Sequence, residues 1–327
     1  NTLNRVAIRR METARSIAES IAPEGSKGKV FIEAYAGCGA LTRALLELPK
    51  ERVARVIAVE DHPTYLDYLE PLVKSDPRLK LREADSFYWE VYDQLQRVHL
   101  EDIRGWDWNS GPHPQLHFIM HVPTTIKGEQ LIAQFLRCIP TRSWFYKYGR
   151  VPTTFILNEY FWDRINASVE DTALRCKLSV ISQATADFNP VQALGTVYEN
   201  FWPQRIPVAG KSKLGRRKLS EPTFYAATAT PFEKQVIAAE GLPAWDYVLR
   251  RLFVNRAQSL SKGLSSLAPG AQSLMRVLEG KLDISKPVRT LSLEEWTKVM
   301  EAFTQWPFAP QNLTIDEGFH DKKKPLG

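Results

Sequence analysis

The sequence predicts an α/β fold, in which helices cover a parallel sheet, followed by a small helical domain and a tail. Short β-rich apolar runs alternate with stretches of helical spacing over the first two thirds of the 327 residues. A glycine-containing turn follows the first apolar run, and the strand pattern stops after Pro231. Such alternation places helices on both faces of a parallel sheet, with ligands at the carboxyl ends of its strands.

The first domain, residues 1–231, contains the alternating pattern. Compact apolar runs of strand length lie at residues 29–35, 54–60, 79–85, 116–122, 152–157, 178–186 and 223–230. Helical spacing with good helix formers lies between them at residues 40–48, 64–73 and 128–138. These patterns predict the strands and helices of the sheet domain.

The second domain, residues 232–306, is predicted to be helical. Its expected helices lie at residues 232–239, 244–254, 272–279 and 293–304. The last one follows Ser292 and has Glu294 and Glu295 in its first turn, as a capped helix should. Residues 307–327 lack an apolar period and carry the basic run 322–324, so we interpret them as a tail.

The composition is that of a soluble globular protein. The chain is 44% hydrophobic and 24% charged, with a mean hydropathy of −0.29. These values exclude a wholly disordered chain and a bundle of membrane spans. The formal charge is 43 − 37 = +6, and the isoelectric point is about 9.1, which favours a polyanionic partner.

The basic excess is regional. Residues 136–218 hold 13 Lys and Arg against 6 Asp and Glu, which leaves 30 against 31 elsewhere. The densest part is a Gly- and Ser-containing stretch with Lys211, Lys213, Arg216, Arg217 and Lys218. This cluster suits phosphate binding, and a solvated surface run is the alternative.

Cysteine and histidine usage indicates neither a disulfide framework nor a metal site. Cys38, Cys138 and Cys176 are scattered and form no CxxC pair, which is typical of a reducing compartment. The histidines at 113, 117 and 121 recur every four residues. They fall on an expected strand, where residues four apart are about 13 Å from one another. The sequence begins at Asn1, so we expect an upstream segment such as a targeting peptide.

A glycine turn after the first strand predicts a nucleotide-binding loop. Gly37 and Gly39 permit a tight turn and close approach of a ligand to a helix N-terminus. Glu60 ends the second strand, 21 residues beyond Gly39, where a carboxylate can accept from ribose hydroxyls. A dinucleotide loop needs a third glycine at position 42, which is Thr42, and this argues against NAD.

The order of these groups resembles that in S-adenosylmethionine-dependent methyltransferases of Rossmann-like fold. In that arrangement Asp85, at the end of the third strand, would accept from the adenine amine. The candidate residues for S-adenosylmethionine are therefore Glu33, Gly37, Gly39, Glu60 and Asp85. The alternative is the same fold with an empty or vestigial pocket.

Several stretches resemble the rRNA adenine dimethyltransferase family, most closely its fungal mitochondrial transcription factor B branch. Residues 33–42 resemble the family loop E-I-G-P-G-x-G-x-L-T, and residues 174–184 resemble its R-L-S-V segment, which we interpret as a strand. Residues 201–203 with the basic stretch to 222 resemble F-x-P-P-P-x-V, and residues 247–260 resemble F-x-x-R-R-x-x-L. Residues 143–150 and 305–310 resemble the fungal branch rather than the enzymes.

Two departures from the family indicate a lost activity. Where the enzymes have N-L-P-Y or N-L-P-F, this chain has His121, Val122, Pro123 and Thr124. Imidazole cannot replace the amide that holds the adenine amine, and threonine has no π face for the flipped base. The family's Q-N-F-L falls near residues 5–8, Arg-Val-Ala-Ile, without its polar contact. No catalytic residue is therefore expected, and Cys38 is interpreted as a small turn residue.

The resemblance implies a transcription initiation factor of the mitochondrial matrix. Its partners would be the single-subunit mitochondrial RNA polymerase and the melted strands of promoter DNA. Phosphates would meet Arg205 and the cluster at 211–218, while bases would stack on Trp144, Tyr148 or Trp202. We expect no membrane contact and a monomer outside the complex. Two alternatives stay open: a mitochondrial rRNA adenine N6,N6-dimethyltransferase, and a silent RNA-binding factor in ribosome assembly.

Overall fold

The computed structural model describes residues 4–196, 200–202 and 223–313. The chain divides into two compact units. The first comprises Asn1–Asn166 with Ile181–Gln235, and the second comprises Ala167–Val180 with Val236–Gly327. A stretch from the middle of the sequence therefore belongs with the C-terminal helices.

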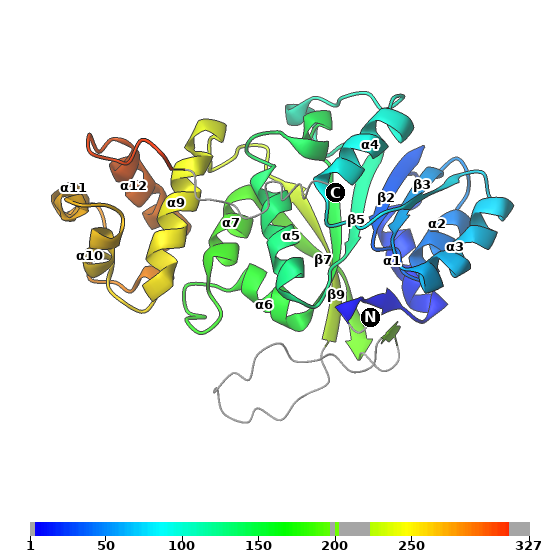
Figure 1. Cartoon of the computed structure of the whole chain (residues 1–327), viewed down its shortest axis with the longest axis horizontal. Helices are drawn as coiled ribbons and strands as arrows, with labels where there is room; N and C mark the ends of the chain where they lie inside the picture. The colour runs from blue at the N-terminus through cyan, green and yellow to red at the C-terminus, as the bar shows by residue number, and fades with distance from the viewer. Residues whose placement is uncertain (1–3, 197–199, 203–222, 314–327) are drawn as a thin grey trace, which may run out of the picture. The chain divides into compact units, whose positions relative to one another are not determined.

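A seven-stranded sheet forms the centre of the first unit (Figure 1). In spatial order its strands are β4 (Leu79–Glu83), β3 (Val53–Glu60), β2 (Lys29–Ala34), β5 (Leu116–His121), β6 (Thr153–Asn158), β9 (Thr223–Pro231) and β7 (Ala186–Thr196). The pairs from β4 to β6 are parallel, as predicted, whereas β9 is antiparallel to both β6 and β7. The sheet is therefore mixed rather than wholly parallel.

Helices cover both faces of this sheet. One face packs against α1 (Met11–Ile21), α2 (Ala40–Glu47) and α3 (Pro63–Ser75), whose Ile17, Leu41 and Leu69 share a core with Ile119 of β5. The adjacent β5 residue, Phe118, points to the opposite face, because side chains alternate along a strand. There it meets residues of α4 (Trp89–His99), α5 (Ile126–Arg137) and the 3₁₀ helix η3 (Trp144–Tyr148). Helix α6 (Glu159–Asn166) also lies in this unit.

A short antiparallel ribbon lies outside the main sheet. It pairs β1 (Ala7–Ile8) with β8 (Phe201–Trp202). Just before this ribbon, the Thr124 amide donates to the carbonyl of Asn4 (3.1 Å). The N-terminal segment therefore runs along the carboxyl ends of the parallel strands, where the sequence places the candidate site.

Two expected elements differ in the structure. Residues 178–186, expected as a strand, are mostly helix α7 (Lys177–Thr185), and the strand β7 begins only at Ala186. Leu178, Val180 and Ile181 are all buried, so the run shows neither helical nor strand alternation. Residues 232–238, expected as a helix, form an irregular turn. The side-chain amide of Gln235 stabilises this turn by donating from its Nε2 to the carbonyls of Thr185 and Phe232.

The second unit is helical. Its α-helices are α9 (Leu242–Leu252), α10 (Leu260–Gly263), α11 (Leu274–Leu278) and α12 (Leu293–Thr304). The predicted cap of α12 is confirmed, since Ser292 and Glu295 form a reciprocal capping box. This unit also contains short 3₁₀ helices: η4 (Ala239–Gly241), η5 (Phe253–Asn255), η6 (Leu264–Ser266), η7 (Ala271–Ser273) and η8 (Val288–Thr290). A further 3₁₀ helix, η2 (Trp108–Ser110), lies in the first unit.

Buried Arg175 ties the 167–180 stretch into this second unit. Its guanidinium donates to the carbonyls of Ala167 (2.7 Å) and Leu291 (3.1 Å). Its own carbonyl accepts from Arg256 (2.7 Å). Hydrogen bonds to backbone carbonyls compensate the desolvation of a side chain that is only 1% exposed.

Candidate functional site

The loop between β2 and α2 makes the tight turn that its glycines predict. Gly37 and Gly39 have φ of 62° and 78°, in the left-handed region. A Cβ on Gly39 would lie 2.6 Å from Leu69 Cδ2, and one on Gly37 would lie 3.2 Å from Ala7 Cβ. The left-handed conformation therefore favours glycine at both positions, and a side chain at either would also crowd a neighbour.

Glu33, at the end of β2, is fully buried and faces the end of β5. The Thr42 hydroxyl donates to its Oε2 (2.6 Å), and His121 Nε2 lies 3.0 Å from its Oε1. Thr42, which stands where a dinucleotide loop has its third glycine, thus serves as a hydrogen-bond donor to Glu33. Both carboxylate oxygens already have a partner within the protein.

The segment from His121 to Thr124 is buried throughout its length. His121 and Val122 are 2% and 1% exposed, and the Val122 amide donates to the carbonyl of Ile156 (2.8 Å). Helix α5 approaches so closely that a Cβ on Gly128 would lie 1.9 Å from the Pro123 carbonyl oxygen. This segment presents an inward-facing imidazole and a small hydroxyl, and it contains no Phe, Tyr or Trp.

Glu60, the candidate ribose acceptor, is engaged by donors of the protein. Arg5 Nη2 donates to both of its oxygens, at 2.6 Å each. The amides of Gly37, Asp61 and His62 donate to the same carboxylate at 2.8, 3.0 and 2.9 Å. A carboxylate offers about four lone-pair sites, so these donors occupy its accepting capacity.

Asp85, the candidate adenine acceptor, is bound by Tyr35. The Tyr35 hydroxyl donates to Asp85 Oδ1 (3.0 Å), which also accepts from the Phe87 amide (2.9 Å). Burial raises the pKa of the Tyr35 hydroxyl well above its usual range, so the hydroxyl stays protonated and able to donate. The Arg5 guanidinium lies 4.2 Å from the centre of the Tyr35 ring.

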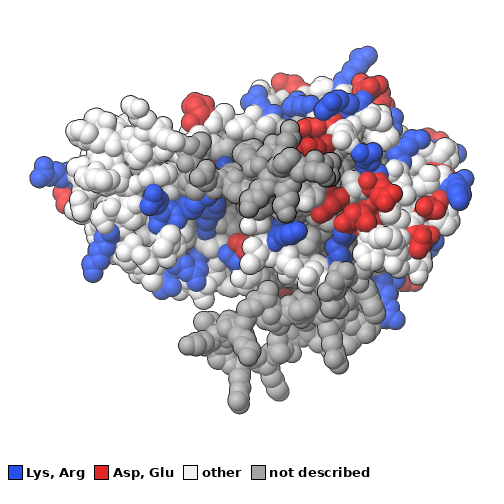
Figure 2. Space-filling view, in the orientation of Figure 1, with Lys and Arg blue, Asp and Glu red and all other residues white. Residues whose placement is uncertain are grey.

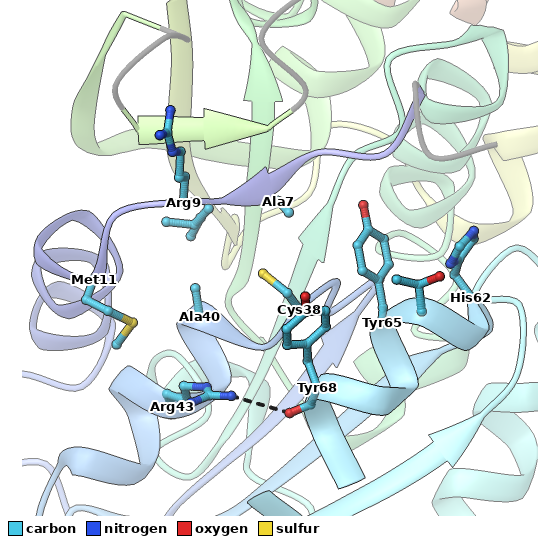
Figure 3. Close-up of a pocket in the computed structure, with 11 residues that line it drawn as sticks. Ala7, Arg9, Met11, Cys38, Ala40, Arg43, His62, Tyr65 and Tyr68 are labelled. Atoms are coloured by element: carbon cyan, nitrogen blue, oxygen red, sulfur yellow. Dashed lines mark hydrogen bonds between the residues drawn. The ribbon is translucent and has the colours of Figure 1, made fainter. Parts of the chain in front are cut away.

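A hollow of about 790 Å³ lies beside the same loop (Figure 3). It is lined by Ala7, Ile8, Arg9, Met11, Cys38, Ala40, Arg43, His62, Thr64, Tyr65 and Tyr68, so Glu33, Glu60 and Asp85 are not part of its wall. Cys38 faces it, but burial raises the pKa of the Cys38 thiol, which disfavours the nucleophilic thiolate. Within the described residues, no three His, Cys, Asp or Glu side chains could hold a metal ion.

The expected nucleic-acid contacts fall in different environments. Arg205, Lys211, Lys213, Arg216, Arg217 and Lys218 lie outside the described residues. Trp144 lies in the core, where its ring stacks on Phe135 at 4.4 Å, so we leave it out of the proposed binding surface. Tyr148 is half-buried, with Lys147 Nζ 5.4 Å from its ring centre. For Trp202 the structure describes only its place in β8.

The described surface carries both signs of charge, as one face shows (Figure 2). Residues 203–218 hold six basic and no acidic residues, whereas residues 136–202 hold seven basic and six acidic ones. Most of the regional excess therefore lies beyond the described residues. In the described part of the chain, no helix is long and apolar enough to cross a membrane.

The sequence pattern of the family described as "Ribosomal RNA adenine dimethylase" matches residues 8–207, more than half of the chain. The chain belongs to this family. Its match begins at β1 and includes the glycine loop, the three candidate carboxylates and the end of β5.

Curated relatives of the chain include mitochondrial proteins of two kinds. It is 21% identical over 260 residues to mitochondrial transcription factor 1 of Lachancea kluyveri, covering 78% of this chain and 75% of the relative. The corresponding protein of Saccharomyces cerevisiae is 23% identical over 270 residues, covering 78% and 74%. A mitochondrial dimethyladenosine transferase 1 of Caenorhabditis elegans is 26% identical over 209 residues, covering 59% and 54%.

Solved structures confirm the predicted methyltransferase fold. A dimethyladenosine transferase from Plasmodium falciparum superposes with a TM-score of 0.61 at 15% identity, covering 91% of this chain and 97% of the other. The 23S rRNA methyltransferase ErmE superposes with a TM-score of 0.55 at 16% identity, covering 91% and 99%. The fold class is therefore that of S-adenosylmethionine-dependent methyltransferases, with C-terminal helices.

The two carboxylates expected to hold the ribose and the adenine already accept from the protein, Glu60 from Arg5 on both oxygens and Asp85 from Tyr35 on Oδ1, and this arrangement does not match a free nucleoside site. Sequence reasoning missed both donors. Tyr35 could have been found, since it stands opposite the first glycine of E-I-G-P-G-x-G. Arg5 gave no such signal, because it lies 55 positions from Glu60 and only the fold brings the two together.

Proposed function

We propose that this chain is a mitochondrial transcription initiation factor. It would help a single-subunit mitochondrial RNA polymerase to melt promoter DNA and engage the start site, with the methyltransferase fold serving as a nucleic-acid-binding scaffold. The observation that carries this proposal is the closed end of β5, where His121 turns inward to Glu33.

Methyl transfer to an adenine amine needs groups at this position that the chain does not have. The amine must be held with its lone pair aimed at the methyl group, and imprecise positioning costs orders of magnitude in rate. His121 is 2% exposed and engaged with Glu33, and Thr124 is 8% exposed. A flipped base would therefore meet neither an Asn side chain nor a Phe or Tyr ring from this segment, and its imidazole is engaged with Glu33.

The relatives named mitochondrial transcription factor 1 support a role in transcription, and they match about three quarters of their own length. By this likeness, the protein would act in the mitochondrial matrix. The basic residues at 205 and 211–218 would neutralise phosphates of a separated strand, which favours binding in a salt-dependent manner.

Two aromatic residues near the amino ends of β5 and β6 offer a second, separate candidate surface in the described chain. Trp106 is 42% exposed, and its amide donates to the carbonyl of Tyr148 (2.8 Å). Lys147 is exposed and lies beside the ring of half-buried Tyr148, so exposed Trp106, this ring and a cation stand close together. Such a combination suits unpaired bases with their phosphates.

Two assays on one preparation test the proposed function. The first measures run-off transcription by the cognate mitochondrial polymerase on a promoter template, with and without this protein. The second measures transfer of labelled methyl groups from S-adenosylmethionine to a small-subunit rRNA hairpin. We expect stimulated transcription and no methylation. Methylated hairpin adenines would establish the enzyme instead, and inactivity in both assays would favour a ribosome-assembly factor.

A further inference from the structure

The carboxyl ends of β2, β3 and β4 carry a continuous set of internal contacts. Arg5 joins Glu60 and Asp61 through its guanidinium, with its Nη1 donating to Asp61 Oδ1 at 2.7 Å. The same guanidinium covers the Tyr35 ring, whose hydroxyl reaches Asp85. Two side chains thus connect both carboxylates that the fold provides for a nucleoside.

Tyr35 occupies its position at a conformational cost. Its φ is 57°, in the left-handed region that a non-glycine residue enters at a cost of about 1–2 kcal/mol. Its ring is nevertheless fixed, because the side chain is 5% exposed and its amide donates to Ser86 Oγ (3.2 Å). A backbone position suited to glycine therefore carries a large ring directed at Asp85.

Arg5 is also held in position by its contacts with the strand ends. Its side chain is 14% exposed, while the Glu60 side chain is fully buried. A charge-assisted contact to a buried carboxylate is strong, since removal of one partner leaves the other desolvated without its counter-charge. The position of Arg5 is also set by its own segment, which pairs with Thr124 at Asn4 and with β8 at Ala7.

We propose that Arg5 and Tyr35 form an internal plug that fills the nucleoside end of the cofactor site. Bound nucleoside hydroxyl and amine groups would have to displace donors that already occupy Glu60 and Oδ1 of Asp85. The guanidinium would also oppose a sulfonium cation by like-charge repulsion. The plug concerns nucleoside binding alone, so it can hold or fail independently of the proposed role in transcription.

Calorimetric titration with S-adenosylmethionine and with the uncharged analogue S-adenosylhomocysteine tests the plug. The proteins compared are the full chain, R5Q, Y35G and the R5Q/Y35G double variant. The matched control is R15Q, which removes an exposed arginine paired with Glu47 at 2.6 Å on the surface. Circular dichroism and thermal melting establish which variants are folded.

The full chain and R15Q should bind both ligands with a Kd weaker than about 1 mM. The folded double variant should bind S-adenosylhomocysteine at least about tenfold more tightly than the full chain, a change of about 1.4 kcal/mol. Tight binding by the full chain, or a folded double variant with no gain, would overturn the plug. If the double variant does not fold, R5Q decides: a tighter Kd supports the plug, and an unchanged Kd refutes it.

Discussion

Acid should destabilise the first unit through His117, a histidine buried in β5. The ring is 4% exposed, with its Nε2 2.7 Å from Thr154 Oγ1. Burial, with a smaller contribution from Lys29, lowers the pKa of His117 from 6.5 to about 3. His117 therefore binds a proton near pH 6.5 in the unfolded chain but only near pH 3 in the folded chain.

The sign and size of the effect follow from this difference. As pH falls through the window from 6.5 to about 3, protonation stabilises only the unfolded state, so the free energy of unfolding decreases. Each pH unit contributes about 1.36 kcal/mol, so the loss at pH 5 is about 2 kcal/mol. Above pH 6.5 the His117 contribution is constant.

Urea denaturation of the full chain and of H117Q, at pH 7.5 and pH 5, measures this quantity. Glutamine keeps a polar group near Thr154 but does not titrate. Burial also lowers the pKa of His113 and His99, and the comparison cancels their contributions because both proteins retain them. We expect the drop in unfolding free energy to be about 2 kcal/mol smaller in H117Q. An equal drop in the two proteins would show that His117 does not cause the loss of stability in acid.

Three further predictions concern packing, nucleic-acid binding and the tail. G128A should lower the free energy of unfolding, measured by urea denaturation, by about 1–3 kcal/mol, because its Cβ would overlap the Pro123 carbonyl. The control G105A should leave the free energy of unfolding unchanged, because a Cβ at that position meets no atom within 4 Å. The triple variant K211A/R216A/R217A should reduce the slope of log K against log [salt] for single-strand binding by about 2. The charge-conserving variant K211R/R216K/R217K should keep the slope of the full chain. Equal slopes in all three proteins would exclude these residues from the interface. Deletion of residues 311–327 should impair initiation with an unchanged melting temperature, and full promoter activity would exclude a role for the tail.

The parallel half of the sheet could be predicted because its apolar runs alternate with helices of clear spacing. The position of β9 could not be predicted in the same way. β9 runs antiparallel to its neighbours β6 and β7, whereas an alternation of strands and helices predicts parallel strands. The α7 run, buried on all sides, has the composition of a strand and the environment of a core helix.

Only those parts of the site that depend on neighbouring residues could be predicted from the sequence. The glycine turn and the carboxylates at the strand ends follow from neighbouring residues, as does the absence of an Asn-and-aromatic motif after β5. The contacts that occupy Glu60 and Asp85 depend on residues 55 and 50 positions away. Such pairings form only after the fold brings the N-terminal segment to the strand ends, so spacing in the sequence does not reveal them.

In the proposed function, this methyltransferase fold assists strand separation at promoters. Run-off transcription by the cognate mitochondrial polymerase, on a duplex promoter and on the same promoter melted beforehand around the start site, tests it most directly. We expect transcription of the duplex to depend on this protein and this dependence to be lost on the melted template. Equal transcription of the duplex with and without the protein would exclude a role in strand separation.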